Sequence, residues 1–197
     1  MITMYKIENK TLYEVIFKQR DVFLDVFMIL VSVVFMAVMA YIRIPLWPVP
    51  ITMQTFGVFS IAFFFGYRKG FLAILAYVLA GLVGLGVFAG YKSGFGALIG
   101  PTGGYIAGFL FMVLIVGWMI EKGYGRSKKS VLMCMLVGEI VLYTFGLAGL
   151  WLYLGNASLA KVLMLGFVPF IIGDTVKALG AVALFPYLWK GAEKISQ

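Results

Sequence analysis

The sequence predicts an all-α membrane protein, a bundle of six transmembrane helices with the N and C termini both in the cytoplasm. The first observation behind this prediction is composition: 63% of the 197 residues are hydrophobic and 12% are charged. A soluble domain has about 45–50% apolar and about 25% charged residues. The second observation is that the basic residues gather in short segments between long apolar runs. A bundle surrounded by lipid can expose this much apolar surface, whereas a soluble fold cannot.

Six apolar runs are expected to cross the membrane, since a helix needs about 20 apolar residues to span the hydrocarbon. They lie at 22–42, 51–66, 71–88, 104–120, 131–154 and 162–188. Residues 1–21 are polar and are expected to form a cytoplasmic tail with room for a short surface helix, and residues 189–197 form the cytoplasmic end. The first run is longer than a signal-peptide core of about 7–15 residues, so it is expected to be retained. The chain is therefore predicted to be a single membrane domain, residues 1–197, with its core at 22–188.

The positions of the basic residues support this count and give the orientation. An even number of crossings places both termini on one side of the membrane. Of the 16 Lys and Arg residues, all fall on the side of the termini except Arg43, Lys92 and Lys161 on the other side and Lys177 within the sixth run. Because basic residues accumulate in cytoplasmic loops, the termini are predicted to be cytoplasmic. The chain is thus expected to be a multi-pass protein of the cell membrane.

The segments predicted to lie outside the cell are more elaborate than those inside. Residues 43–50 contain three prolines, Pro45, Pro48 and Pro50, which cannot continue a helix and favour a stiff, extended turn. Residues 89–103 are rich in glycine, which allows tight turns or a close approach to a ligand. Residues 155–161 form the third outer loop. An elaborate outer face favours the capture of something from outside.

Two acidic residues lie deep in the predicted spans, where a charge costs about 2.5–3.5 kcal/mol on insertion scales. Asp174 has a partner of opposite charge in Lys177, three residues on and on the same helix face. The pair is either a structural ion pair or the polar part of a ligand site, and the nearby Pro169 and Gly173 favour the second interpretation. Glu139 has no partner at helical spacing. It is expected to be buried neutral, or to pair with another helix or a partner protein.

Other residues near the predicted outer face could complete a ligand site. Hydrogen-bonding groups are available at Thr52, Gln54, Thr102, Tyr105 and Tyr143. The aromatic rings of Phe88 and Phe170 could pack against an apolar ligand body. Trp47 fits equally well as an interfacial anchor.

Several classes of function are excluded. The chain has no histidine, which removes the commonest metal ligand and general base. A nucleotide-binding G-x-x-x-x-G-K-[ST] loop is absent from the sequence, so any dependence on ATP must come through a partner. The net charge of +8 reflects topology, and nucleic-acid binding is not expected.

Three segments of the sequence resemble the BioY family: PVPITMQTF at 48–56, GPTGGYIAGF at 100–109 and PFIIGDTVK at 169–177. The resemblance, which extends from about 22 to 188, implies the S component of an energy-coupling factor (ECF) transporter that is specific for biotin. It implies a six-helix ECF S-component-like fold with a biotin pocket near the outer face, formed by Asp174 and Lys177 with Thr102, Gly103 and Tyr105 nearby. It also implies a separate coupling membrane subunit and two ABC ATPases as partners, and docking through small residues on the first span. Here that span offers either Ser32, Met36 and Ala40 or Val33, Ala37 and Tyr41.

The chemistry of biotin suits these residues. Biotin has two ureido N–H donors, a carbonyl acceptor, an apolar ring and chain, and a carboxylate. Asp174 can accept from the ureido N–H groups, and Lys177 can donate to the ureido oxygen or balance Asp174. Phe88 and Tyr143 can flank the rings, while Lys92, or less favourably Arg43, can meet the carboxylate. No covalently bound cofactor is expected.

Three alternatives are weighed against biotin capture. The chain could be an S component for another vitamin, thiamine or riboflavin. An intramembrane enzyme would need a nucleophile with a base or a metal site, for which the sequence offers little. A passive structural or channel protein is disfavoured by the deep Asp–Lys pair and the stiff outer loops.

Overall fold

The computed structural model describes residues 10–19, 21–155 and 157–196 and is an all-α bundle with a two-stranded sheet at one end. The helices are α2 (Leu12–Ile16), α3 (Val22–Tyr41), α4 (Gln54–Leu82), α5 (Phe95–Ile99), α6 (Gly103–Glu121), α7 (Lys128–Tyr153), α8 (Leu159–Gly166) and α9 (Ile171–Ser196), with a 3₁₀ turn, η1, at Val168–Phe170. Strands β1 (Arg43–Ile44) and β2 (Ile51–Thr52) pair antiparallel across the proline-rich turn. Within the described residues, five helical stretches are long and apolar enough to cross a membrane.

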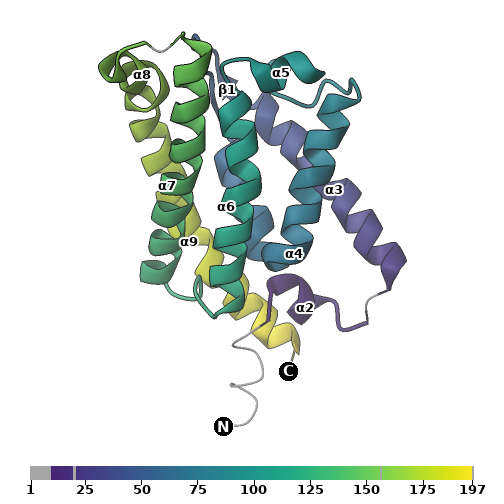
Figure 1. Ribbon diagram of the computed structural model, residues 1–197. Helices are drawn as coiled ribbons and strands as arrows, with labels where there is room; N and C mark the ends of the chain where they lie inside the picture. The colour runs from purple at the N-terminus through teal and green to yellow at the C-terminus, as the bar shows by residue number, and fades with distance from the viewer. Residues whose placement is uncertain (1–9, 20, 156, 197) are drawn as a thin grey trace.

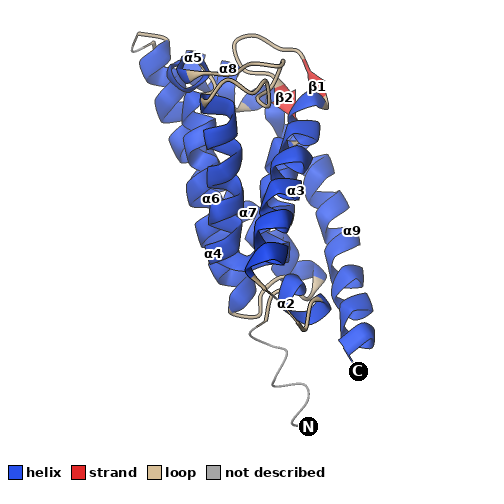
Figure 2. Ribbon diagram, turned by 90° about the vertical axis from the view of Figure 1, so that its right-hand side faces the viewer, coloured by secondary structure: helices blue, strands red, loops and turns tan. Residues whose placement is uncertain are grey.

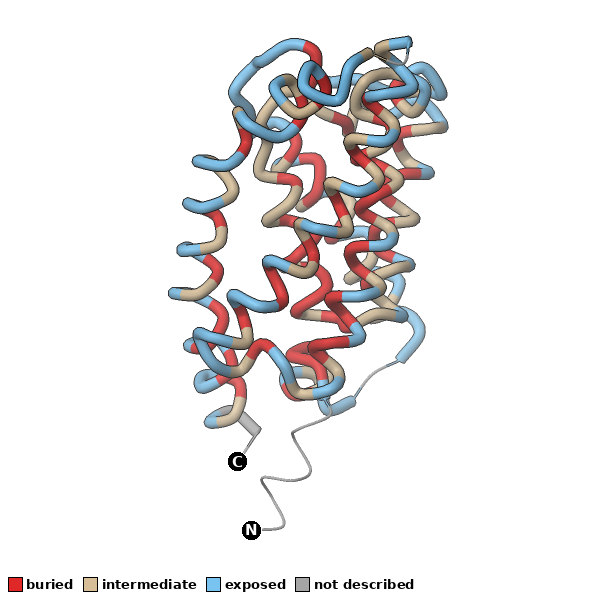
Figure 3. Tube along the Cα trace, turned by 60° about the vertical axis from the view of Figure 1, so that its left-hand side comes forward, coloured by how far each residue is buried: buried red, intermediate tan, exposed pale blue. Residues whose placement is uncertain are grey.

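The long helices run side by side along the length of the molecule (Figure 1). Strands β1 and β2 and helices α5 and α8 lie together at one end (Figures 1 and 2). We call this the loop end, with the 83–94 loop included. Helix α2 and the last turns of α9 lie at the opposite end, the α2 end. The buried positions line the inside of the bundle, while exposed positions follow the outer sides of the helices (Figure 3).

Helix α4 is folded back on itself. Gly66 has a non-helical backbone (φ 75°, ψ −164°), and a side chain there would collide with the Glu121 carboxylate. The Gln54 amide nitrogen donates to the Tyr77 hydroxyl at 2.8 Å, although the two residues are 23 positions apart. In a straight helix they would be about 35 Å apart. The expected runs 51–66 and 71–88 therefore correspond to two antiparallel arms joined at Gly66.

The second arm ends earlier than predicted. A helix was expected to continue to Phe88, but α4 ends at Leu82 and residues 83–94 form a loop. Gly84 has a φ of +104°, a conformation that glycine adopts at little cost and that does not continue a helix.

The run 162–188 is also not the single helix that was expected. It contains the end of α8, the turn η1 and the start of α9. Pro169 lies in η1 and lacks the N–H that a continuous helix would need. Asp174 consequently lies in the first turn of α9. Helix α8 also begins within the segment expected to be the third outer loop, which places Lys161 on a helix.

The two terminal segments are more structured than a tail and a free end. Residues 1–9 of the expected tail lie outside the described residues. Helix α2 begins with a capping box between Thr11 and Glu14 and buries Leu12, Tyr13 and Val15. Helix α9 continues to Ser196, and its Trp189 packs edge-on against Phe63 of α4. The expected end at 189–197 is thus mostly the last part of a packed helix.

Candidate functional site

A cavity of about 590 Å³, including its open mouth, lies at the loop end of the bundle. It is bounded by the proline-rich turn, the start of α4, the 83–94 loop, the first half of α6, α7, η1 and the start of α9. Its lining is mostly apolar with a few polar groups, as is typical of small-molecule sites. The lining residues are Val49, Pro50, Thr52, Gln54, Thr55, Phe88, Ala89, Lys92, Thr102, Tyr105, Ile106, Phe109, Leu142, Tyr143, Phe170, Asp174 and Lys177.

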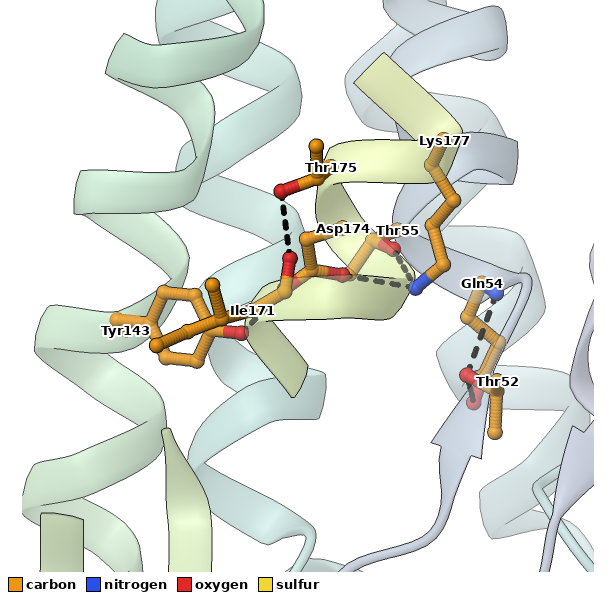
Figure 4. Close-up of polar contacts among 8 residues, drawn as sticks. All are labelled: Thr52, Gln54, Thr55, Tyr143, Ile171, Asp174, Thr175 and Lys177. Carbon is orange, nitrogen blue, oxygen red and sulfur yellow. Dashed lines mark hydrogen bonds and ion pairs between the residues drawn. The ribbon is translucent and has the colours of Figure 1, made fainter. Parts of the chain in front are cut away.

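A buried ion pair forms one wall of this cavity. The Lys177 ammonium lies 2.9 Å from a carboxylate oxygen of Asp174 and donates to the Thr55 hydroxyl at 2.8 Å (Figure 4). The side chains of Lys177 and Asp174 are only 5% and 12% exposed. Because Asp174 lies in the first turn of α9, the positive end of the helix dipole also stabilises its negative charge. The interruption between α8 and α9 at η1 thus places the N-terminus of a long helix at the cavity.

An aromatic cluster supports this carboxylate and closes the adjoining wall. The Tyr143 hydroxyl donates to the second oxygen of Asp174 (Figure 4). Tyr105 donates to the Gly166 carbonyl at 2.6 Å and stacks on Phe170 with ring centroids 6.3 Å apart. Tyr105 therefore connects α6 to the end of α8 and stabilises the interruption between α8 and α9. Tyr143 packs edge-on against Phe167.

Gln54 positions the 83–94 loop. Its amide donates to the Tyr77 hydroxyl, which donates to the Val87 carbonyl at 3.0 Å. The next residue, Phe88, is buried against Tyr77, and its ring occupies the place where a side chain on Gly81 would lie. The Phe88 N–H donates to the Lys92 carbonyl at 3.1 Å, so residues 88–92 form a tight turn at the cavity.

The structure gathers almost all of the residues expected from the sequence around this cavity. Those that line it are Gln54, Phe88, Lys92, Thr102, Tyr105, Tyr143, Asp174 and Lys177. Gly103 is not among the lining residues; a side chain there would collide with the Leu98 carbonyl of α5. Neither Arg43 nor Trp47 lines the cavity: the Arg43 guanidinium lies beside Gly90, and Trp47 is exposed.

Thr55 is the most informative residue that the sequence analysis missed. It supplies the second hydrogen bond to Lys177. Its only sequence signal is its position next to Gln54 within the segment PVPITMQTF. Its partner is 122 positions away, so spacing along the chain could not identify it.

A second hollow lies on the other side of Tyr143 and Asp174. This groove of about 1360 Å³ runs between α7 and α9, has mostly apolar walls, and shares Tyr143 and Asp174 with the cavity. Glu139 lies in it. Both carboxylate oxygens of Glu139 are buried without a hydrogen-bond partner among the described residues. The interhelical partner that was considered for Glu139 is therefore not seen in the described part of the chain.

Known proteins share both the sequence and the fold of this chain. A family model described as the BioY family matches residues 10–194. A biotin transporter BioY from Thermotoga maritima is 38% identical over 74% of this chain and 83% of its own length. A probable biotin transporter BioY from Pyrococcus horikoshii is 37% identical over 81% of this chain and 93% of its own length.

Among solved structures, the chain is similar to the crystal structure of an S-component for biotin from an ECF-type ABC transporter. The TM-score is 0.70 at 24% sequence identity, with 84% of this chain and 90% of that chain covered. At this identity the likeness shows the fold alone. The sequence matches, which cover most of the chain and of its relatives, show more: the chain belongs to the BioY family.

Proposed function

We propose that this protein is the biotin-binding S component of an ECF-type transporter and captures biotin in the cavity at the loop end. The observation that carries the proposal is the buried Asp174–Lys177 pair, held by Tyr143 and Thr55 at the wall of a mostly apolar cavity. Relatives at 38% and 37% identity are described as a biotin transporter and a probable biotin transporter. Transport, rather than catalysis, is the activity of this family.

The hydrogen-bonding capacity of the pair matches the ureido group of biotin. Each oxygen of Asp174 already accepts one hydrogen bond, and each keeps a second lone pair for a ureido N–H. The Lys177 ammonium uses two of its three N–H donors for Asp174 and Thr55, which leaves one for the ureido oxygen. Phe88 and Tyr143, which line the cavity, would flank the rings. Lys92, which lines the cavity and is exposed, would meet the carboxylate.

The two arms of α4 support a count of six crossings with both termini on the same side. The α2 end carries the basic residues near the turn at Gly66, between α6 and α7, and near the end of α9; they include Arg68, Lys69, Lys122, Lys128, Lys129, Lys190 and Lys194. Such an accumulation is typical of the cytoplasmic side. The loop end then faces outward, where it can collect the vitamin.

Energy for release inward would come from partners: a coupling membrane subunit and two ABC ATPases. Helix α3 is suited to docking, because much of its surface is apolar and exposed, for example at Phe23 and Val34. Ser32, Met36 and Ala40 are buried and cannot provide the docking stripe. In the other stripe Ala37 is also buried, Val33 is half-buried and Tyr41 is exposed, so the contact would have to use the outer apolar side chains together with Tyr41.

The test is direct binding to the detergent-purified protein. We expect calorimetry to show one biotin per chain, and excess thiamine or riboflavin to leave the biotin isotherm unchanged. Biotin at about 100 times its dissociation constant should add about 2.7 kcal/mol to the free energy of unfolding. Preferential binding of thiamine or riboflavin would assign a different vitamin, and no thermal stabilisation by any of the three would refute the proposal.

A further inference from the structure

A third hollow adjoins the mouth of the ligand cavity. It is a groove of about 540 Å³ between the 83–94 loop and the segment that contains α5 and the start of α6. Lys92 and Thr102 line both this groove and the ligand cavity. These two side chains therefore border both spaces, and a ligand that reaches Lys92 from the cavity lies next to the groove.

The lining of this groove is small and partly polar. Ser93, Gly96 and Gly100 contribute short side chains or bare backbone. A side chain added at Gly96 would have no other atom within 4 Å, so this position on the groove lining has room for one. Lys92 is the cation of the lining and lies exposed on the turn at 88–92. Such a channel suits a flexible polar chain better than the aromatic cavity does.

We propose that this groove receives the part of a ligand that extends beyond the carboxyl carbon of biotin, so that biotin amides bind as well as free biotin. The inference rests on the proposed function, because it takes the ureido group to be held by Asp174 and Lys177. The ligand class is biotin joined through its carboxyl group to the side-chain amine of lysine, alone or in a short peptide. Hydrolysis of proteins that carry biotin on a lysine would supply such compounds.

Lys92 and Thr102, which line both the cavity and the groove, can bind both forms of the ligand. With free biotin, the Lys92 ammonium faces a carboxylate. With the amide, the carbonyl oxygen can accept from Lys92 or Thr102, and the free carboxylate of the attached lysine can also lie near Lys92. Because Lys92 is exposed, replacing the carboxylate by an amide carbonyl as its acceptor should cost little binding free energy. We expect the dissociation constant of biotinyl-lysine to be within about tenfold of that of biotin.

The variant that tests this groove is Gly96→Leu. Gly96 lies in α5 with an ordinary helical backbone, so leucine fits the local conformation and adds four carbon atoms at a position that lines the groove. The matched control is Gly180→Leu in α9, another exposed helical glycine with no atom near its Cβ position and remote from α5 in sequence. Calorimetry with biotin and with biotinyl-lysine is done on the wild type and both variants.

We expect Gly96→Leu to weaken biotinyl-lysine at least tenfold and biotin by less than twofold, with Gly180→Leu changing neither. Binding of biotin, but not of biotinyl-lysine, by the wild type would overturn the inference and leave the proposed function standing. Equal effects of Gly96→Leu on the two ligands, including no effect on either, would also overturn it. If the wild type bound neither ligand, the proposed function itself would fail.

Discussion

The two hollows on either side of Tyr143 and Asp174 share a wall but differ in how their polar groups are satisfied. On the cavity side, Asp174 is paired with Lys177 and accepts a hydrogen bond from Tyr143. On the groove side, the Glu139 carboxylate has no partner among the described residues. Both acids occur in apolar runs of the sequence, so hydropathy alone would make them equally good candidates for a ligand site. An acid in an apolar run is therefore suited to bind a ligand where the fold gathers polar partners around it, as it does for Asp174 and not for Glu139 within the described residues.

The largest effect should come from removing the acid on the cavity side. Asp174→Ala leaves the Lys177 ammonium buried without its counter-ion, and breaking a buried pair in this way costs about 3–5 kcal/mol. We expect biotin affinity to fall at least about 100-fold by calorimetry, while the protein remains folded.

The chain offers a matched control for this substitution. Asp25 also pairs with a lysine, Lys69, at 2.6 Å, but at the α2 end and with both side chains about 30% exposed. Asp25→Ala should leave biotin affinity unchanged. Equal losses in the two variants would show that the effect is general destabilisation, and unchanged binding in Asp174→Ala would remove the pair from the ligand site.

The next effect should come from the shared wall itself. Tyr143→Phe keeps the ring that separates the two hollows but removes the hydrogen bond to Asp174. A hydrogen bond to a charged group contributes about 1.5–3 kcal/mol, so we expect affinity to fall by roughly tenfold or more. If titration calorimetry gave Tyr143→Phe the same biotin dissociation constant as the wild type, the Tyr143 hydroxyl would have no part in orienting the Asp174 carboxylate.

A smaller effect is expected at the mouth of the cavity. Lys92 is exposed, and exposed ion pairs contribute about 0–1 kcal/mol. Lys92→Met should therefore weaken biotin about three- to fivefold and make its binding less sensitive to salt. A loss as large as that of Asp174→Ala would mean that the carboxylate, rather than the ureido group, dominates recognition.

The smallest effect on binding is expected on the groove side. Glu139→Met preserves side-chain length and removes a buried carboxylate that has no hydrogen bond among the described residues. We expect the biotin dissociation constant to stay within about twofold, and the melting temperature to rise by roughly 2–4 °C because an unpaired polar group no longer has to be buried. A large loss of biotin binding would place Glu139 in the ligand site and erase the contrast between the two hollows.

Much of the cavity could be found from the sequence even where the surrounding elements could not. Phe88 was expected in a helix and lies in a loop, yet it lines the cavity. Gly103, which was also expected at the site, does not line the cavity for a geometric reason. Thr102, Tyr105, Ile106 and Phe109 follow the spacing of one helix face and line the cavity, whereas Gly103 points toward α5.

The features that escaped sequence analysis depend on contacts between distant segments. Hydropathy located the apolar runs, but it could not show that α8 and α9 are separated at η1, since the residues on both sides of the break are apolar. The contact between Thr55 and Lys177 likewise requires two helices that are far apart in sequence to be packed first.

Because the chain reverses at Gly66, the lengths of the two arms of α4 determine which of their residues lie opposite each other. Gln54 lies 12 residues before the reversal and Tyr77 lies 11 after it, so their hydrogen bond forms only when both arms have the right length. Each residue of a helix advances the chain by about 1.5 Å and turns it by about 100°. Inserting one residue into either arm would rotate one partner away from the other and release the carbonyl of Val87 and the turn at Phe88 that follows it. A change of length in one arm would thus alter the loop end, at the cavity that we propose to bind biotin.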